Sequence, residues 1–160
     1  MYILDIFFKK RKFTEIFEKA WIVIGNNISL VHDGENGTDP VLEMYYFVSM
    51  VYSTVFHCAE AAGMSPSSAH YLARMQTRDS KVDPPIVAAA QELFAVPDDE
   101  KMRDYVDHLN SRIKSIVSSA VESDGGPDQA ETEQAVQDIY TYFQNCGFSV
   151  EELFAKDEDD

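Results

Sequence analysis

The chain has 160 residues, of which 45% are hydrophobic, and this size and composition predict one domain whose core needs neither a disulfide nor a structural metal. Its net charge is −15 and is uneven, because residues 1–20 hold five basic and three acidic side chains, or +2, and the rest of the chain therefore carries −17. Such a surface repels the phosphate backbone of nucleic acids and attracts basic proteins.

The order of charged and apolar residues argues against export and membrane insertion. Residues 1–8 are largely apolar and precede the basic residues 9–12, whereas a secretory signal begins with its positive charges. The longest uncharged run, residues 44–59, is shorter than the roughly 20 residues that span a membrane. Cys58 and Cys146 lack the short paired spacing of zinc or redox sites. We therefore expect a cytoplasmic chain with reduced cysteines, no metal and no cofactor.

Residues 1–13, MYILDIFFKKRKF, have two interpretations. They form either the first helix of a bundle or a helix that lies on an anionic membrane, with Ile3, Leu4, Phe7 and Phe8 inserted and the basic run at the headgroups. Packing is favoured, because most amphipathic helices bury their apolar stripe in their own core. Membrane contact is then at most peripheral and confined to this segment.

The next predicted element is a helix from Thr14 to about Ile24. Thr14 has a side chain suited to an N-cap, and apolar residues follow it at helical spacing. Gly25-Asn26-Asn27 is expected to end this helix, and residues 31–38, VHDGENGT, are rich in turn formers. A loop is therefore predicted before the next helix.

A long central helix is predicted over residues 40–62. Asp39-Pro40 supplies an N-cap followed by proline at the first helical position, and Gly63 provides the stop. Because residues 44–59 are apolar on nearly every side, this helix should be buried by its neighbours.

Three further helices are predicted after Gly63. Ser65-Pro66 and Asp83-Pro84 repeat the cap-plus-proline signal, and they predict short helices to about Thr77 and over residues 84–95. Pro97 separates the second of these from an amphipathic helix over residues 98–121. The apolar stripe of that helix consists of Met102, Tyr105, Val106, Leu109, Ile113, Ile116, Val117 and Ala120.

The remaining signals complete an all-α prediction. Gly125-Gly126-Pro127 ends the amphipathic helix, and Asp128 with Glu131 forms a capping box that opens a helix to about Gln144. Residues 148–153 open one more helix, and residues 156–160 form a disordered acidic tail. No segment has the strict alternation of a strand. We expect a compact bundle of six to seven helices around the buried central helix 40–62, as a single domain over residues 1–155.

Residues 55–78 contain a pattern that resembles a helix-turn-helix motif. Such a motif needs a small residue at the helix crossing, glycine in the turn and apolar residues that lock the second helix, and Ala59, Gly63, Met64, Ala69 and Leu72 have this spacing. The resemblance implies that Ser67, Ser68, His70, Tyr71 and Arg74 read the major groove and that Arg78 reaches a phosphate. The charge of the chain argues against nucleic acid as a partner.

Acidic side chains cluster near the start of the amphipathic helix, at Asp98, Asp99, Glu100, Asp104 and Asp107. The first three complement the positive end of the helix dipole, which is a sufficient stabilising role. The Glu-x-x-His spacing of di-metal bundles does not occur, and neighbouring His57 and Cys58 diverge by about 100° on a helix, so they do not form a nucleophile and base. The five acidic residues are candidates for contact with a basic partner.

The sequence favours a non-enzymatic acidic protein–protein interaction module, such as an immunity protein, antitoxin or secretion chaperone that masks a basic surface of its partner. The first alternative is a helix-turn-helix DNA-binding regulator that uses residues 55–78. The second is a helical enzyme whose site the sequence does not reveal. No catalytic residue is predicted, and the oligomeric state is left open.

Overall fold

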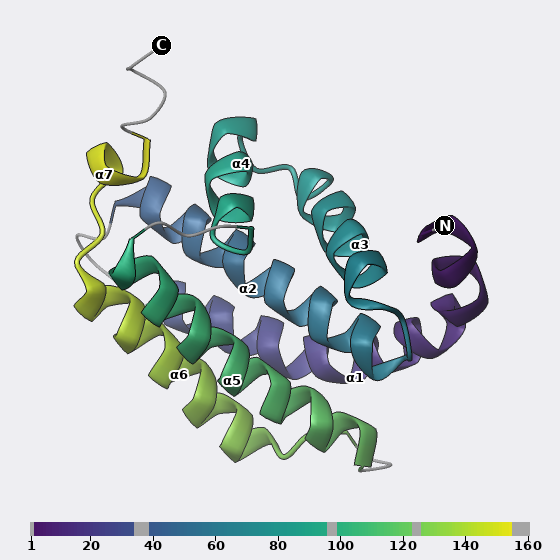
Figure 1. Ribbon diagram of the computed structural model, residues 1–160. Helices are drawn as coiled ribbons and strands as arrows, with labels where there is room; N and C mark the ends of the chain where they lie inside the picture. Colours follow the sequence, from purple (N-terminus) through teal and green to yellow (C-terminus); the bar gives the residue numbers. More distant parts are fainter. Residues whose placement is uncertain (1, 34–38, 96–98, 123–125, 155–160) are drawn as a thin grey trace.

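The computed structural model describes residues 2–33, 39–95, 99–122 and 126–154, and these residues form helices and connecting turns without a strand (Figure 1). The all-α prediction is confirmed. The helices are α1 (Tyr2–Asp33), α2 (Pro40–Ala61), α3 (Pro66–Arg78), α4 (Pro84–Glu92), α5 (Glu100–Glu122), α6 (Gln129–Cys146) and α7 (Val150–Phe154). None of these helices combines the length and the apolar character needed to cross a membrane. The acidic tail predicted at 156–160 lies outside the described residues.

Helix α2 is the centre of the bundle, as predicted. It begins where the Asp39 carboxylate accepts a hydrogen bond from the Val41 backbone N–H at 2.8 Å, and it is followed by Gly63 in the left-handed region at φ 97°. Helices α1, α3, α4 and α5 all pack against it (Figure 1). Its buried residues are Tyr45, Tyr46, Val48, Ser49, Met50, Tyr52, Ser53, Thr54, Val55, His57, Cys58 and Ala59. Within the apolar run 44–59, Phe47, Val51 and Phe56 are partly buried and Met44, near the start of the helix, is 47% exposed.

Helix α1 differs from the prediction at both ends. The Thr14 hydroxyl does not cap a helix but donates to the Lys10 carbonyl one turn back, inside a helix that begins at Tyr2. The helix also continues through Gly25-Asn26-Asn27 to Asp33, and the Asn27 side chain donates to the Val23 carbonyl within it. Burial of Ile24 and Ile28 on either side of this segment outweighs its weak helix propensity.

The other helix starts follow the predicted caps. Ser65 and Asp128 accept hydrogen bonds from Ser68 N–H at 3.2 Å and Glu131 N–H at 2.9 Å, whereas Asp83 makes no side-chain cap bond. Helix α4 ends at Glu92 rather than near residue 95, and α6 runs to Cys146, where Gly147 adopts φ 67°. These differences are small and leave the order of helices unchanged.

An aromatic cluster locks α2, α5 and α6 together. Tyr46 packs edge-on against Tyr140 of α6, with ring centroids 5.1 Å apart, and Tyr105 of α5 lies 5.2 Å from Phe143. The buried Tyr105 hydroxyl also shares a 2.6 Å hydrogen bond with Ser49 of α2. These contacts hold α5 and α6 against α2 as neighbours.

Candidate functional surfaces

The structure describes four of the five carboxylates predicted to contact a partner, and these four have different surroundings. Asp98 lies outside the described residues, and Asp99 caps α5, where its carboxylate accepts from the Lys101 N–H at 2.7 Å. Glu100, Asp104 and Asp107 are exposed and follow one another at helical spacing on the outward face of α5. We call these three residues the α5 acidic stripe.

The stripe belongs to a wider acidic region built from α5, α6 and α7. Residues 99–122 and 126–154 contain eleven Asp and Glu residues but only four Lys and Arg residues. Two of those four basic side chains are engaged within the region, since Lys101 lies 2.6 Å from Glu152 and Arg112 lies 2.8 Å from Asp138. The net charge of this region is therefore −7, whereas residues 2–33 and 39–95, with ten acidic and eight basic side chains, carry −2.

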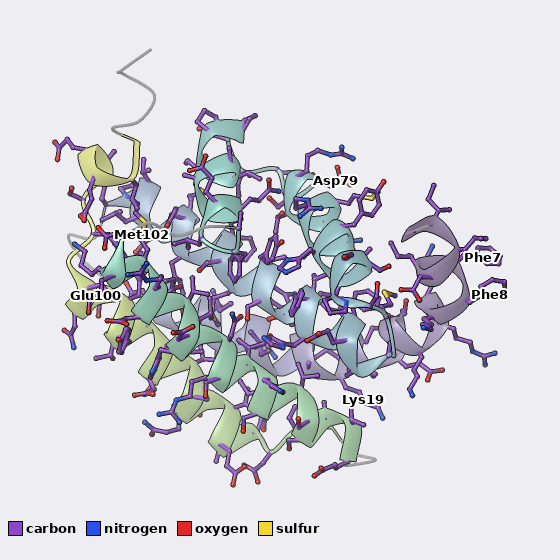
Figure 2. All side chains as sticks on the ribbon, viewed as in Figure 1. Phe7, Phe8, Lys19, Asp79, Glu100 and Met102 are labelled. Carbon is purple, nitrogen blue, oxygen red and sulfur yellow. The ribbon has the colours of Figure 1, made fainter. Side chains whose placement is uncertain are left out.

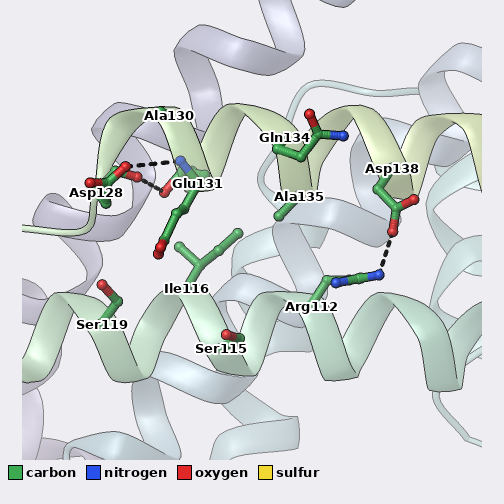
Figure 3. Close-up of a pocket in the computed structure, with 11 residues that line it drawn as sticks. Arg112, Ser115, Ile116, Ser119, Asp128, Ala130, Glu131, Gln134, Ala135 and Asp138 are labelled. Atoms are coloured by element: carbon green, nitrogen blue, oxygen red, sulfur yellow. Dashed lines mark hydrogen bonds and ion pairs between the residues drawn. The ribbon is translucent and has the colours of Figure 1, made fainter.

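A groove of about 540 Å³ runs between α5 and α6 (Figure 3). Small side chains leave it open, namely Ser115 and Ser119 on α5 and Ala130 and Ala135 on α6, and Ile116 provides an apolar wall. Sequence reasoning missed this groove. The signal was the run of small residues on the faces of α5 and α6 that turn out to be adjacent.

Carboxylates stand at both ends of the α5–α6 groove. Glu131 is exposed and points across it toward α5, next to the capping residue Asp128 (Figure 3). At the other end, Asp138 pairs with Arg112 and also lies 3.1 Å from the His108 imidazole, which stacks on Tyr142 at 4.2 Å between ring centroids. An apolar wall between carboxylates suits the aliphatic stem and charged end of a lysine or arginine side chain.

The residues predicted to read DNA lie on the opposite side, along α3. Ser67, His70 and Arg74 line a groove of about 570 Å³, and Tyr71, Arg74 and Arg78 line a second, adjoining one. Helix α4 forms the other wall of both grooves through Ala88 and Gln91. Ser68 is buried and bonds to the Ser65 hydroxyl, so it faces the protein. The outer face of α3 is thus flanked by α4, and Ser67, Arg74 and Arg78 on it are exposed.

His70 joins the α3–α4 groove to the core. Its Nδ1 lies 2.8 Å from the Tyr52 hydroxyl, and its ring packs 4.4 Å from that of Phe56. Burial, with a contribution from nearby Arg74, lowers the pKa of His70 and favours its neutral form. The groove therefore presents a neutral imidazole, a phenol and a guanidinium, a set suited to hydrogen bonding.

His57 and Cys58 are neighbours in sequence, but their side chains lie in different surroundings. The Cys58 thiol is buried, which raises its pKa to about 12, so it is not a thiolate nucleophile near neutral pH. His57 instead faces α5, where its Nε2 lies 3.2 Å from the Asn110 side-chain oxygen that also accepts from the Ser53 hydroxyl at 2.7 Å. This polar contact is structural, because it joins α2 to α5 inside the bundle. Cys146, the other free cysteine, is half-buried.

The buried position of His57 predicts an acid-sensitive fold. Burial lowers the pKa of His57, and Lys114 adds to this, although the hydrogen bond with Asn110 acts in the opposite direction. As the pH decreases below the ordinary value of 6.5, His57 binds a proton in the unfolded chain but resists it in the folded chain. The free energy of unfolding should therefore decrease as the pH decreases, until the pH passes the lower pKa of the folded state. His70 contributes in the same direction.

We expect His57→Gln, which keeps a donor for Asn110, to reduce this pH dependence. Urea denaturation at about pH 7.5 and about pH 5.5 measures it, and the variant should lose less stability between the two values than the unsubstituted chain. Equal losses in the two proteins would show that His57 is not held neutral.

Comparisons with protein-family models, curated proteins and solved structures find no match to this chain. Among the described residues, no group of three or more His, Cys, Asp or Glu side chains is placed to hold a metal ion.

Proposed function

We propose that the chain is an interaction protein that binds a basic partner protein through the acidic region of α5, α6 and α7. The observation that carries this proposal is the excess of eleven carboxylates over four basic side chains on this side of the bundle, around a groove with an apolar wall. Immunity proteins, antitoxins and secretion chaperones are the classes that match an acidic chain covering a basic surface.

Binding has two physical components. The charge of the region steers a basic partner toward it and raises the association rate, an effect that salt screens. A lysine or arginine of the partner then enters the α5–α6 groove, with its stem against Ile116 and its charge beside Glu131. The α5 acidic stripe precedes the groove-lining residues along α5, and its exposed carboxylates are available to further basic residues of the partner.

The α5 acidic stripe provides the test. We expect Glu100→Lys with Asp104→Lys and Asp107→Lys to weaken capture of the partner from lysate of the native cell by tenfold or more, because attraction becomes repulsion at three points. The matched control changes the same charge on other surfaces, at Glu60, Asp79 and Glu92, each to lysine. The control should retain the partner, and the retained protein should be basic and should elute with salt.

Equal capture by the stripe variant and its control would contradict the proposal, as would the absence of any retained protein. The net charge of −15 favours this function over DNA reading by residues 55–78. A gel shift on duplex DNA at low salt that is lost in Arg74→Ala would reverse that preference.

A further inference from the structure

The first three turns of α1 expose apolar side chains that the core does not use. We call residues 2–12 the arm. In Figure 2, Phe7 and Phe8 point away from the bundle into open space. The exposed fractions are 74% for Ile3, 57% for Leu4, 71% for Phe7 and 75% for Phe8. The prediction that these four apolar side chains pack in the core is therefore wrong, because a different face of the helix meets the bundle.

The bundle-facing side of the arm is held by polar contacts. The Asp5 carboxylate accepts from the Ser65 N–H at 3.0 Å and pairs with Lys9 at 2.8 Å, and the Lys9 ammonium donates to the Gly63 carbonyl at 2.6 Å. Hydrogen bonds from Lys9 and Ser65 hold the pKa of Asp5 well below its usual range. Ile6 is half-buried against the core. These contacts fix the arm to the turn between α2 and α3, so its apolar face is presented outward.

The basic residues next to the apolar face of the arm indicate which kind of surface this face binds. Lys10, Arg11 and Lys12 are all exposed and come directly after the apolar residues, whereas the chain beyond residue 20 carries −17. A helix with large apolar residues on one face and adjacent cationic residues is suited to the interface of an anionic bilayer. We propose that the arm binds a membrane surface that contains anionic lipid, with Phe7 and Phe8 between the headgroups and residues 10–12 against their phosphates.

The carboxylates of α1 that follow the arm offset this positive charge only in part. Helical rise is about 1.5 Å per residue, so Glu18 lies roughly 9–12 Å along α1 from residues 10–12, beyond the Debye length of about 8 Å at physiological salt. Glu15, the closest carboxylate on the exposed face, lies 3.7 Å from Arg11 and offsets part of one positive charge.

A second copy of the chain fits the arm less well. On the same face, Arg11, Glu15 and Glu18 follow the four apolar residues, so the apolar patch is too short for a continuous helix pair. Parallel pairing of two arms would also place residues 10–12 of one copy next to residues 10–12 of the other, and these like charges would repel. Self-association is therefore an outcome to be distinguished by the test.

Vesicle flotation of the full chain tests the proposal. We expect binding to phosphatidylcholine vesicles that contain about 30% phosphatidylglycerol and much weaker binding to phosphatidylcholine alone. Replacing Lys10, Arg11 and Lys12 by glutamine should reduce the partition coefficient by roughly 100-fold, and Phe7→Ser with Phe8→Ser by at least tenfold. The matched controls are Arg74, Arg78 and Lys81 to glutamine, and Ile22→Ser, which alters an exposed residue of α1 outside the arm.

Both controls should bind as the unsubstituted chain does, and circular dichroism should show equal helix content in all variants. Absence of binding to the anionic vesicles would overturn the proposal, as would equal binding to both vesicle types. A dimer in sedimentation equilibrium that Phe7→Ser with Phe8→Ser abolishes, without vesicle binding, would assign the arm to self-association instead. The residues proposed to contact the membrane lie in α1 and none belongs to α5 or α6, so failure of this proposal would leave the α5–α6 proposal untouched.

Discussion

Replacing Met50 with alanine is expected to destabilise the folded chain by about 2–5 kcal/mol. Met50 is completely buried in α2, at the centre of the bundle, and alanine would remove three side-chain heavy atoms and leave a cavity. The loss combines the transfer free energy of those atoms with the contacts that their neighbours no longer make. Urea denaturation followed by circular dichroism measures the change in free energy of unfolding.

Met44 provides a matched control in the same helix. It is 47% exposed, so Met44→Ala removes fewer contacts and should change the free energy of unfolding by about 1 kcal/mol or less. A similar loss for Met44→Ala and Met50→Ala would contradict the central position of α2, because the two substitutions differ mainly in burial.

The second large effect is expected at Asn110, where replacement by alanine should cost about 1–3 kcal/mol. The Asn110 side-chain oxygen accepts from Ser53 at 2.7 Å and lies 3.2 Å from His57 Nε2, and both of these partners are buried polar residues of α2. Alanine would remove their acceptor and leave two buried polar groups to be desolvated without compensation.

Thermal and urea unfolding of Asn110→Ala test this expectation beside Asn145→Ala, whose side chain is exposed on α6. Asn145→Ala should lie within about 0.5 kcal/mol of the unsubstituted chain. If the two alanine variants were equally stable, the polar contact between α2 and α5 would not contribute to the fold.

Helix boundaries were predictable where local chemistry and burial agree. Asp39-Pro40, Ser65-Pro66 and Asp128 combine a capping side chain with a favourable first turn, and each precedes a helix in the structure. The prediction failed at Thr14 and at Gly25-Asn26-Asn27, where local signals for a start and a stop lie inside α1. Each local signal changes the free energy of the helix by about 1 kcal/mol, and the free energy gained by burying the flanking apolar side chains is larger.

The candidate surfaces were less predictable, because they depend on which helices are neighbours. Acidic composition near the start of α5 was visible in the sequence, but the capping role of Asp99 and the outward direction of Asp104 needed the structure. The α5–α6 groove exists because Ser119 and Ala135 lie on facing surfaces of two helices. Periodicity assigns residues to one face of a helix and does not say what that face meets.

The arm also shows that periodicity alone does not predict what a helix face contacts. Its sequence pattern allowed both packing and membrane contact, and general experience with amphipathic helices favoured packing. In the structure, Asp5 and Lys9 instead contact the bundle, so Phe7 and Phe8, on another face of the same helix, point outward. Hydrogen bonds to the turn after α2, which is distant in sequence, determine the outcome.

Site-specific photo-crosslinking in the native cell tests the proposed function most directly. A photoreactive amino acid at Ser115 or Ser119, inside the α5–α6 groove, should form a covalent link to a basic protein, and the same group at exposed Gln76 of α3 should not. Crosslinks that occur only at Gln76, or at neither groove position, would contradict the assignment of this acidic region as the partner-binding surface.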